Sequence, residues 1–177
     1  ISNLDASYTD FVKGELFRVG DTPVPRYVLF AVILTLIMWF IWNKTTFGKN
    51  MFAVGSNPEA AKVSGVNVMR TTILVHTLAG AMYGLTGFIE SSRIGSNTAN
   101  TGLNYECDAI AACVVGGVSF TGGIGKISGV VTGVLIFTAL TYSLTILGID
   151  TNLQFIFEGI IILAAVTLDC LKYVKKK

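Results

Sequence analysis

The sequence predicts an all-α protein, a multi-pass transmembrane helical bundle with a short cytoplasmic helix and a Gly-rich broken membrane segment. Two observations predict this class: a high apolar content with few charged residues, and several apolar stretches of near-membrane length. Apolar residues make up 52% of the 177 residues and charged residues only 14%, with a mean hydropathy of +0.65. A soluble domain has about 25% charged residues. The composition therefore excludes a soluble globule and a disordered chain. The net charge of +2 is too small for a nucleic-acid surface.

Apolar stretches of near-membrane length mark the spans, because about 20 helical residues cross the hydrocarbon core. The first stretch has Tyr27 at one end and Trp39 and Trp42 at the other, as interfacial aromatic belts do. We expect an extracytoplasmic segment at 1–26 and a transmembrane domain at 27–171, followed by a basic tail at 172–177. The expected spans are about 25–42, 71–89, 109–125, 127–149 and 151–171, with a loop at 43–70.

The stretch at 109–125 is unusual, because glycines crowd its second half. The apolar run before them, 109–115, is too short to cross a membrane by itself. Either a short helix continues through the glycines, or the chain breaks there and lines a cavity. Broken backbone at membrane depth is tolerated only inside protein or beside water, so this stretch is the local candidate for a permeation path.

The distribution of basic residues predicts the orientation. The loop at 43–70 has four basic residues against one acidic residue, Glu59, and the tail is rich in lysine. Under the positive-inside rule, these segments are cytoplasmic if the stretch at 109–125 crosses fully. We therefore expect five crossings, with the N-terminus outside and the C-terminus cytoplasmic. If that stretch only dips and returns, the tail lies outside. An odd number of crossings without a targeting signal indicates the C-terminal part of a longer protein.

The loop at 43–70 contains the signals of a short helix. Ser56, Asn57 and Pro58, followed by Glu59, are typical of a helix start, and Gly65 of a helix end. The apolar face, Ala60, Ala61 and Val63, is too small to anchor in lipid. It suits docking on a cytoplasmic partner, and the alternative is a loop helix packed on its own protein.

The remaining motifs predict packing rather than chemistry. Gly125, Gly129 and Gly133 recur at four-residue spacing, as do Gly80 and Gly84, which lets helices approach closely. The three cysteines, Cys107, Cys113 and Cys170, lack a metal-binding spacing and are interpreted as small apolar fillers. No nucleotide-binding loop or catalytic constellation is found, so we expect a transport subunit rather than an enzyme.

Several segments together resemble the ABC-type monosaccharide permease subunits of bacteria, in their ribose/galactose branch. The resemblance covers residues from about 14 to 177, the C-terminal half of such a subunit, and is strongest to the galactose-type members. It is carried by FGKNMFAVGSNPEAAKVSGVNV at 47–68, IESSRIGS at 89–96, YECDAIAACVVGGVSFTGGIGK at 105–126, GVVTGVLIF at 129–137 and LDCLKYVKKK at 168–177.

The resemblance implies the translocation path of an ATP-driven importer of galactose, methyl galactoside or a related monosaccharide, in the bacterial cytoplasmic (inner) membrane. It implies two cytoplasmic ABC ATPase subunits, an extracytoplasmic sugar-binding protein and a second permease copy as partners. It implies no cofactor or metal in this chain, since ATP and Mg²⁺ belong to the ATPase. Ribose, xylose or a nucleoside are alternative substrates. A passive channel or secondary carrier with a glycine-rich filter, or a structural subunit without a pore, is the alternative of another class.

The same resemblance implies roles for individual residues. The ATPase-coupling set is Asn57, Pro58, Glu59, Ala60, Ala61, Lys62, Ser64 and Gly65. The translocation-path set is Glu106, Asp108, Gly116, Gly117, Ser119, Gly122, Gly123 and Gly125. Glu158 is added to this set as a charged residue inside a membrane segment, not by the resemblance. Glu90 and Arg93, three residues apart, are expected to pair on a helix and are the candidates for docking the binding protein.

Two positions depart from the family pattern. Position 107 is Cys where Leu is expected, and position 158 is Glu where relatives often have Lys. A charged residue inside a membrane segment is costly and usually functional. Glu158 is expected either to face the central cavity or to make a hydrogen-bonded contact with a neighbouring helix.

Overall fold

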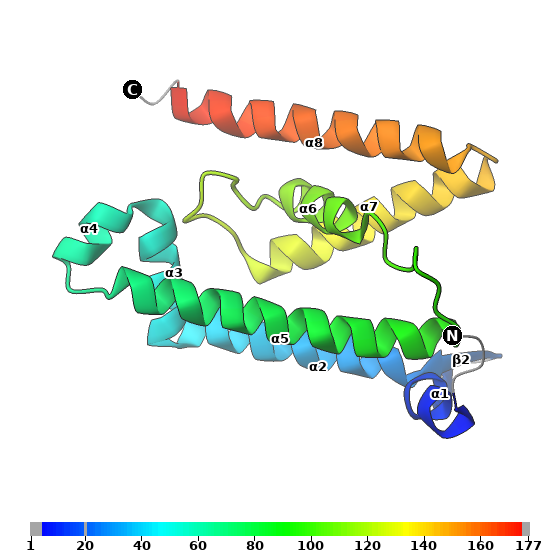
Figure 1. Ribbon diagram of the computed structural model, residues 1–177. Coiled ribbons are helices and arrows are strands. Elements are labelled where there is room, and N and C mark those ends of the chain that lie inside the picture. Colours follow the sequence, from blue (N-terminus) through cyan, green and yellow to red (C-terminus); the bar gives the residue numbers. More distant parts are fainter. Residues whose placement is uncertain (1–4, 20, 175–177) are drawn as a thin grey trace. The chain divides into compact units, whose positions relative to one another are not determined.

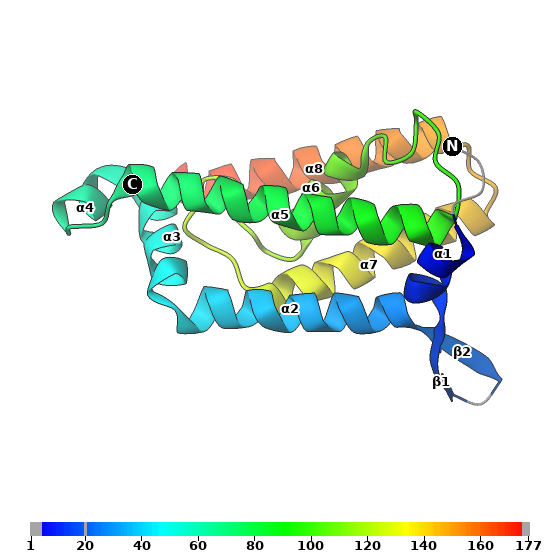
Figure 2. The ribbon, with the colours of Figure 1, turned by 60° about the horizontal axis from the view of Figure 1, so that its bottom comes forward.

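The computed structural model describes residues 5–19 and 21–174, which are mainly helical (Figures 1 and 2). They divide into two compact units, described separately below: residues 1–49 with 67–101, and residues 50–66 with 102–177. The elements are α1 (Ala6–Lys13), β1 (Glu15–Val19), β2 (Thr22–Pro25), α2 (Arg26–Lys44), α3 (Thr46–Ser56), α4 (Pro58–Val63), α5 (Val68–Ile94), α6 (Tyr105–Val115), α7 (Ile127–Ile146) and α8 (Thr151–Val174).

In the first unit, the short helix α1 packs against the end of α5. Tyr8 donates its hydroxyl hydrogen to the Phe88 carbonyl at 2.6 Å, and the Ser92 hydroxyl donates to the Tyr8 carbonyl at 3.0 Å. Val12 and Ser92 are fully buried in this contact. No secondary structure was predicted for residues 1–26, so α1 is a finding of the structure. Asp5 caps this helix by accepting a hydrogen bond from the Ser7 amide at 2.8 Å.

A two-stranded antiparallel hairpin, β1 with β2, connects α1 to α2. Phe17 lies opposite Val24, and Val19 lies opposite Thr22. The two prolines of β2 are tolerated because a two-stranded sheet has only edge strands. An exposed ion pair links Arg18 to Glu15 at 3.0 Å. The sequence did not predict this hairpin, since the apolar run ELFRV is short and two prolines follow it closely.

In the second unit, α6 packs against both α7 and α8 (Figure 1). The buried cluster consists of Ala111 and Ala112 of α6 and Phe137 of α7, with Ile161 and Ile162 of α8 packed against it. Small side chains on α6 allow the two longer helices to approach it. The core that positions the glycine-rich connection after α6 is therefore built around a helix of only 11 residues.

Glycines bring α6 and α7 into backbone-to-backbone contact. A Cβ added at Gly133 would meet the Ala112 carbonyl, and one added at Gly129 would meet the Gly116 carbonyl. These contacts confirm the predicted close packing at Gly129 and Gly133. Around Gly80 and Gly84, by contrast, nothing beyond the helix's own backbone lies within 4 Å of an added Cβ. Among the described residues of the first unit, no close packing partner is found for these two glycines.

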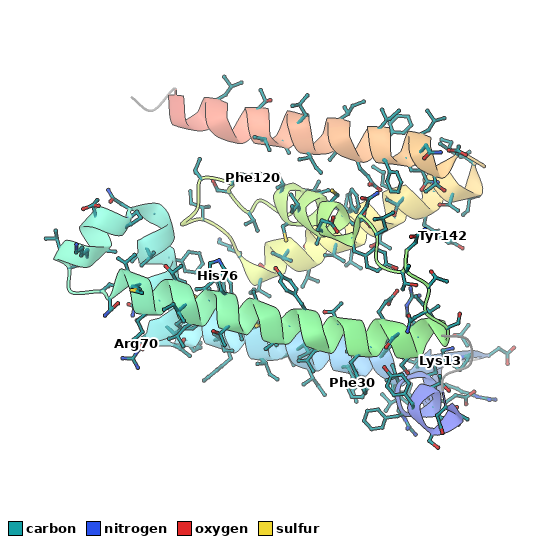
Figure 3. All side chains as sticks on the ribbon, in the orientation of Figure 1. Lys13, Phe30, Arg70, His76, Phe120 and Tyr142 are labelled. Atoms are coloured by element: carbon teal, nitrogen blue, oxygen red, sulfur yellow. The ribbon has the colours of Figure 1, made fainter. Side chains whose placement is uncertain are left out.

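The long helices agree with the membrane class. By length and composition, α2, α5 and α7 can cross a membrane, and Thr151–Thr167 of α8 forms a shorter apolar helix. Leu36 and Phe40 of α2 are 60% and 57% exposed, as lipid-facing side chains are. Figure 3 shows side chains projecting outward all along these helices. The predicted spans 25–42, 71–89, 127–149 and 151–171 thus coincide with helices to within a few residues at most ends.

The predicted fifth span is not one helix. Its helix ends at Val115, and residues 116–126 form an irregular connection. Eleven helical residues reach about 16 Å, half the hydrocarbon thickness. Of the two alternatives that the sequence left open, the structure has the broken chain. Whether this segment crosses completely stays a prediction. In the basic tail, residues 175–177 and the side chain of Lys172 lie outside the described residues. The side chain of Cys170, just before the tail, also lies outside them.

The glycine contacts between α6 and α7 predict opposite effects of the same substitution at two sites. Gly133→Ala should destabilise the protein by about 1–3 kcal/mol, because the new methyl group forces two backbones apart. Gly84→Ala, in open space, should be neutral or stabilise by up to about 1 kcal/mol. The temperature of half-maximal aggregation of the detergent-purified full-length protein measures both changes. Equal temperatures for the two variants would contradict the close packing.

Candidate functional site

Helix α4 has a complete set of end signals. The Asn57 side chain accepts a hydrogen bond from the Ala60 amide at 3.0 Å, and Pro58 is the first helical residue. At the other end, Gly65 has a φ of +84°, which suits glycine. The Gly65 amide bonds the Lys62 carbonyl, and the Val66 amide bonds the Ala61 carbonyl, both at 3.0 Å. This is a Schellman ending, and both predicted ends of the helix are confirmed.

The expected apolar face of α4 is divided between two sides of the helix. Ala61 is 4% exposed and packs on the chain itself, whereas Val63 is 90% exposed. Glu59, Ala60 and Lys62 are also exposed. Ala61 therefore holds the helix in place, and a mixed apolar and charged surface faces outward. Ser64, the last residue of the predicted coupling set, ends the helix and is exposed.

Helix α3 precedes α4 directly and was not predicted. The Thr45 hydroxyl accepts a hydrogen bond from the Gly48 amide at 3.1 Å near its start, and the Asn57 amide bonds the Ala53 carbonyl at 3.0 Å at its end. Two glycines, Gly48 and Gly55, lower the helix propensity and hid the helix in the sequence. The threonine at 45 is the signal by which it could have been found.

The glycine-rich connection between α6 and α7 is held by its own backbone. Gly117, Gly122 and Gly123 have φ values of +83°, +88° and +70°, a region that other residues rarely adopt. The Ser119 amide donates to the Ile124 carbonyl at 3.0 Å, and the Ser119 and Thr121 hydroxyls are 2.8 Å apart. The glycines therefore shape a turn rather than continue α6.

This connection lies directly on the end of α3. A Cβ added at Gly55 would be 2.8 Å from the Gly123 nitrogen, and one added at Gly122 would be 2.5 Å from the Gly55 carbonyl oxygen. Next to the contact is a cavity of about 410 Å³. Its lining residues are Phe52, Gly116, Gly117, Gly123, Ile124, Gly125, Lys126, Ser128 and Gly129. Four of the five glycines of the predicted path thus line one cavity, beside the segment that leads into α4.

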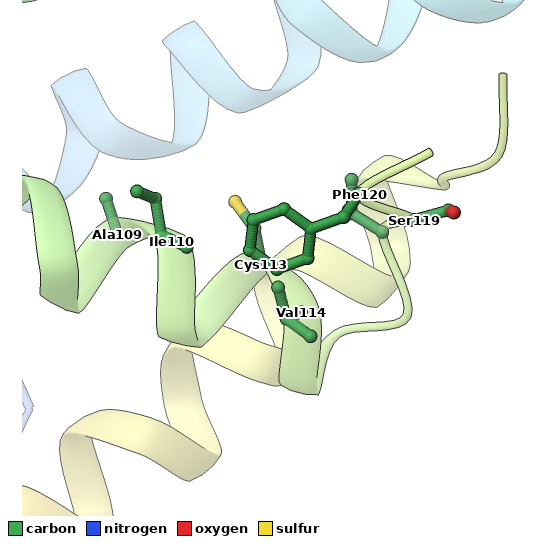
Figure 4. A pocket seen from close by; sticks show the side chains of 7 residues that line it. Ala109, Ile110, Cys113, Val114, Ser119 and Phe120 are labelled. Carbon is green, nitrogen blue, oxygen red and sulfur yellow. The ribbon is translucent and has the colours of Figure 1, made fainter. Parts of the chain in front are cut away.

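A second cavity of about 250 Å³ follows α6 on its way into the connection (Figure 4). Ala109, Ile110, Cys113 and Val114 line it along the helix, and Val118, Ser119 and Phe120 close its far end. The lining is almost wholly apolar. Ser119 is the single residue of the predicted path set that borders it. Cys113, interpreted as an apolar filler, is partly buried here.

The acidic residues of the predicted path lie apart from the glycines. Asp108, in the first turn of α6, contacts Glu158 of α8, and Glu158 is only 6% exposed. The Oδ1 atom of Asp108 is buried without a hydrogen-bond partner among the described residues. Glu106 is exposed. Glu158 therefore contacts a neighbouring helix, and its predicted role at the central cavity stays a prediction. The path set forms two groups rather than one.

Glu90 and Arg93 pair as the sequence predicted. Arg93 donates from Nε and Nη2 to the two carboxylate oxygens of Glu90, at 2.7 and 2.6 Å. The pair lies in the last turns of α5, where Gly95 ends the helix with a φ of +77°. This planar two-point contact fixes both side chains on the surface. Their predicted role in docking a partner stays a prediction.

Comparison with known protein families identifies the family of this chain. Residues 2–166 match the family described as "Branched-chain amino acid transport system / permease component". The chain belongs to this permease family. The match covers both units and includes α4, the glycine-rich connection and the acidic pair. It confirms the predicted class, a component of a multi-pass membrane transport protein rather than an enzyme.

Curated relatives of this permease chain are sugar permeases. It is 51% identical over all 177 residues to "Galactose/methyl galactoside import permease protein MglC" of Haemophilus influenzae, and covers 52% of that protein. The protein of the same name in Treponema pallidum is 57% identical over 153 residues, 86% of this chain and 29% of that protein. "Ribose import permease protein RbsC" of Bacillus subtilis is 40% identical over 169 residues, 96% of this chain and 52% of that protein.

This permease chain spans about half the length of the Haemophilus influenzae and Bacillus subtilis relatives, and less of the Treponema pallidum relative. The similarity to relatives of the galactose type confirms the predicted resemblance to the ribose/galactose branch of monosaccharide permeases. No solved structure matches the chain.

The capped ends of α4 predict that its stability depends on a single side chain. Asn57→Ala should remove the hydrogen bond to the Ala60 amide at a cost of about 1 kcal/mol. Amide hydrogen exchange in residues 58–66 should then become about fivefold faster. Asn57→Ser keeps a capping oxygen and should exchange within twofold of the wild type. Unchanged exchange in Asn57→Ala would show that the cap does not hold the helix.

Proposed function

We propose that this chain is the C-terminal part of a permease that imports galactose or methyl galactoside, driven by a separate ATPase. The observation that carries the proposal is the identity of 50–57% to permeases with that name. The identity to xylose, ribose and arabinose permeases is lower, at 38–42%. The difference favours the galactose type, with ribose, xylose or a nucleoside as the alternatives.

The proposed orientation has five crossings, with the start of the chain outside and its end in the cytoplasm. The packing of the glycine connection on the end of α3 supports a full crossing at 109–125. The connection and the basic loop at 43–70 are then on the same side of the membrane. Helix α7 starts from that side, and the basic tail after α8 returns to it. The positive-inside rule makes that side cytoplasmic.

The proposed contact with the ATPase is made by α4. The helix has capped ends and presents Glu59, Lys62 and Val63 to its surroundings. A rigid helix with one exposed apolar side chain between charges suits a groove on a protein partner. The ATPase would bind ATP and Mg²⁺, and this chain would contribute the lever that responds to nucleotide-driven closure of the ATPase pair.

The proposed path for the sugar uses polar groups within a largely apolar bundle. Carboxyl oxygens of Asp108 and Glu158 accept hydrogen bonds, and sugar hydroxyls donate them. The buried Oδ1 of Asp108 has such a capacity unused among the described residues. A second copy of the permease would complete the path, and the outer surface around Glu90 and Arg93 would meet the sugar-binding protein. These partners follow from the family resemblance.

Uptake measurements test the proposed function and its substrate. The full-length permease, reconstituted in vesicles with its ATPase and binding protein, should accumulate labelled galactose only when ATP is supplied. Unlabelled galactose and methyl galactoside should compete, and ribose and xylose should compete at least tenfold less. Accumulation that is equal without ATP would indicate the passive channel instead. Preferential competition by ribose or xylose would assign the chain to an alternative substrate.

The proposed ATPase contact predicts the effect of a charge reversal. Glu59→Lys should reduce recovery of the ATPase with the purified permease at least tenfold, because Glu59 is exposed in the first turn of α4. Deletion of residues 60–64 should abolish recovery. Asp10→Lys, the reversal of another exposed acidic residue, in the proposed extracytoplasmic segment, is the matched control and should have no effect. Full recovery in both α4 variants would refute the contact.

A further inference from the structure

We propose that Gly55, Gly122 and Gly123 form a rigid backbone link that passes movement of α4 to α6 and α7. The inference rests on the proposed function, because it concerns how the ATPase stroke reaches the membrane helices. The three glycines act as positioning residues in this link: they let two backbones meet without side chains between them. Gly122 and Gly123 belong to the predicted sugar path, whereas no pattern in the sequence predicts a role for Gly55.

The distances define a contact on both of its sides. A Cβ at Gly55 would lie 2.8 Å from the Gly123 nitrogen, and a Cβ at Gly123 would lie 2.7 Å from both the Cα and Cβ of Ser56. A Cβ at Gly122 would lie 2.5 Å from the Gly55 carbonyl oxygen. No residue other than glycine fits any of these positions without a shift of the backbone. The close approach of the two backbones therefore requires glycine at all three positions.

Gly55 shows that close approach, rather than flexibility, explains the glycines. It lies inside α3, one residue before the end of the helix, where a glycine is about 1 kcal/mol less favourable than alanine. Its backbone has no positive φ that would demand glycine. The packing of the connection against it is the compensating gain that the structure shows.

The link continues without interruption to both sides. Towards α4, Ser56 ends α3 and Asn57 caps α4, so the contact lies within two residues of the exposed helix. Towards the membrane helices, Gly116 ends α6 in contact with Gly129 of α7. Backbone atoms in contact cannot relax by changing rotamers, as side chains do. A displacement of α4 is therefore transmitted rather than absorbed.

Separating the two backbones should uncouple the transporter. In the full-length permease assembled with its ATPase and binding protein, Gly55→Ala places a methyl group in the contact. ATPase association and ATP hydrolysis should stay within about twofold of the wild type, while galactose transported per ATP hydrolysed should fall at least tenfold. Gly80→Ala, in a helix with open space around the added methyl, is the matched control and should transport normally.

Gly122→Ala tests the same link from its other side, which matters if Gly55→Ala fails to assemble. The new methyl group would lie 2.5 Å from the Gly55 carbonyl oxygen, so galactose transported per ATP hydrolysed should again fall at least tenfold. Gly148→Ala is the matched control. Gly148 also has a positive φ, +73° against +88° at Gly122, but nothing beyond its chain neighbours lies within 4 Å of an added Cβ. This control should transport within about twofold of the wild type.

The outcomes separate this inference from the proposed function. Absence of ATP-driven uptake by the wild-type assembly would refute the proposed function. If the wild type transports, normal coupling in Gly55→Ala would refute the link. A loss of coupling in Gly148→Ala equal to that in Gly122→Ala would also refute it, because the strain of a positive φ would then explain the loss. Uncoupling by Gly55→Ala and Gly122→Ala together with normal transport by Gly148→Ala would support the link.

Discussion

The backbones of α6 and α7 meet where Gly116 faces Gly129 and Ala112 faces Gly133, with no side chain between them. Most of the second unit depends on this contact. Helices in lipid gain little from the hydrophobic effect when they associate, so close packing and polar contacts must hold them together. The same contact ends α6 after 11 residues and turns the chain through glycines with positive φ. A broken segment at membrane depth is tolerated where its amide and carbonyl groups are bonded within protein or reach water, and several of these groups are bonded within the turn.

From this contact, the unit extends in two directions that serve different purposes. On one side, the glycine connection packs on the end of α3 and, through it, on the capped helix α4. On the other side, α6 packs on α8 through small apolar side chains and through the contact of Asp108 with Glu158. A short helix thus lies between the exposed helix α4 and the buried polar pair.

Membership of a permease family and a detailed role are supported by different observations. The family follows from a match over residues 2–166. Its description names branched-chain amino acids, whereas the curated relatives of this chain are named for sugars. The family therefore fixes the architecture, and the substrate has to be inferred from the nearer relatives.

The sequence by itself determined the membrane class, the positions of four long apolar helices, both ends of α4 and the pairing of Glu90 with Arg93. Hydropathy, capping side chains and i,i+3 spacing are local properties, and they act over a few residues. It could not reveal α1, the hairpin of β1 and β2, or α3, whose short or glycine-containing segments become ordered by contacts with residues distant in the chain. Only the tertiary structure decided that Glu158 meets Asp108, that Ala61 faces inward, and that the glycines at 122 and 123 pack on Gly55. Such choices depend on which backbones come close in space, and a glycine in a sequence does not show whether it serves a turn, a path or a close approach.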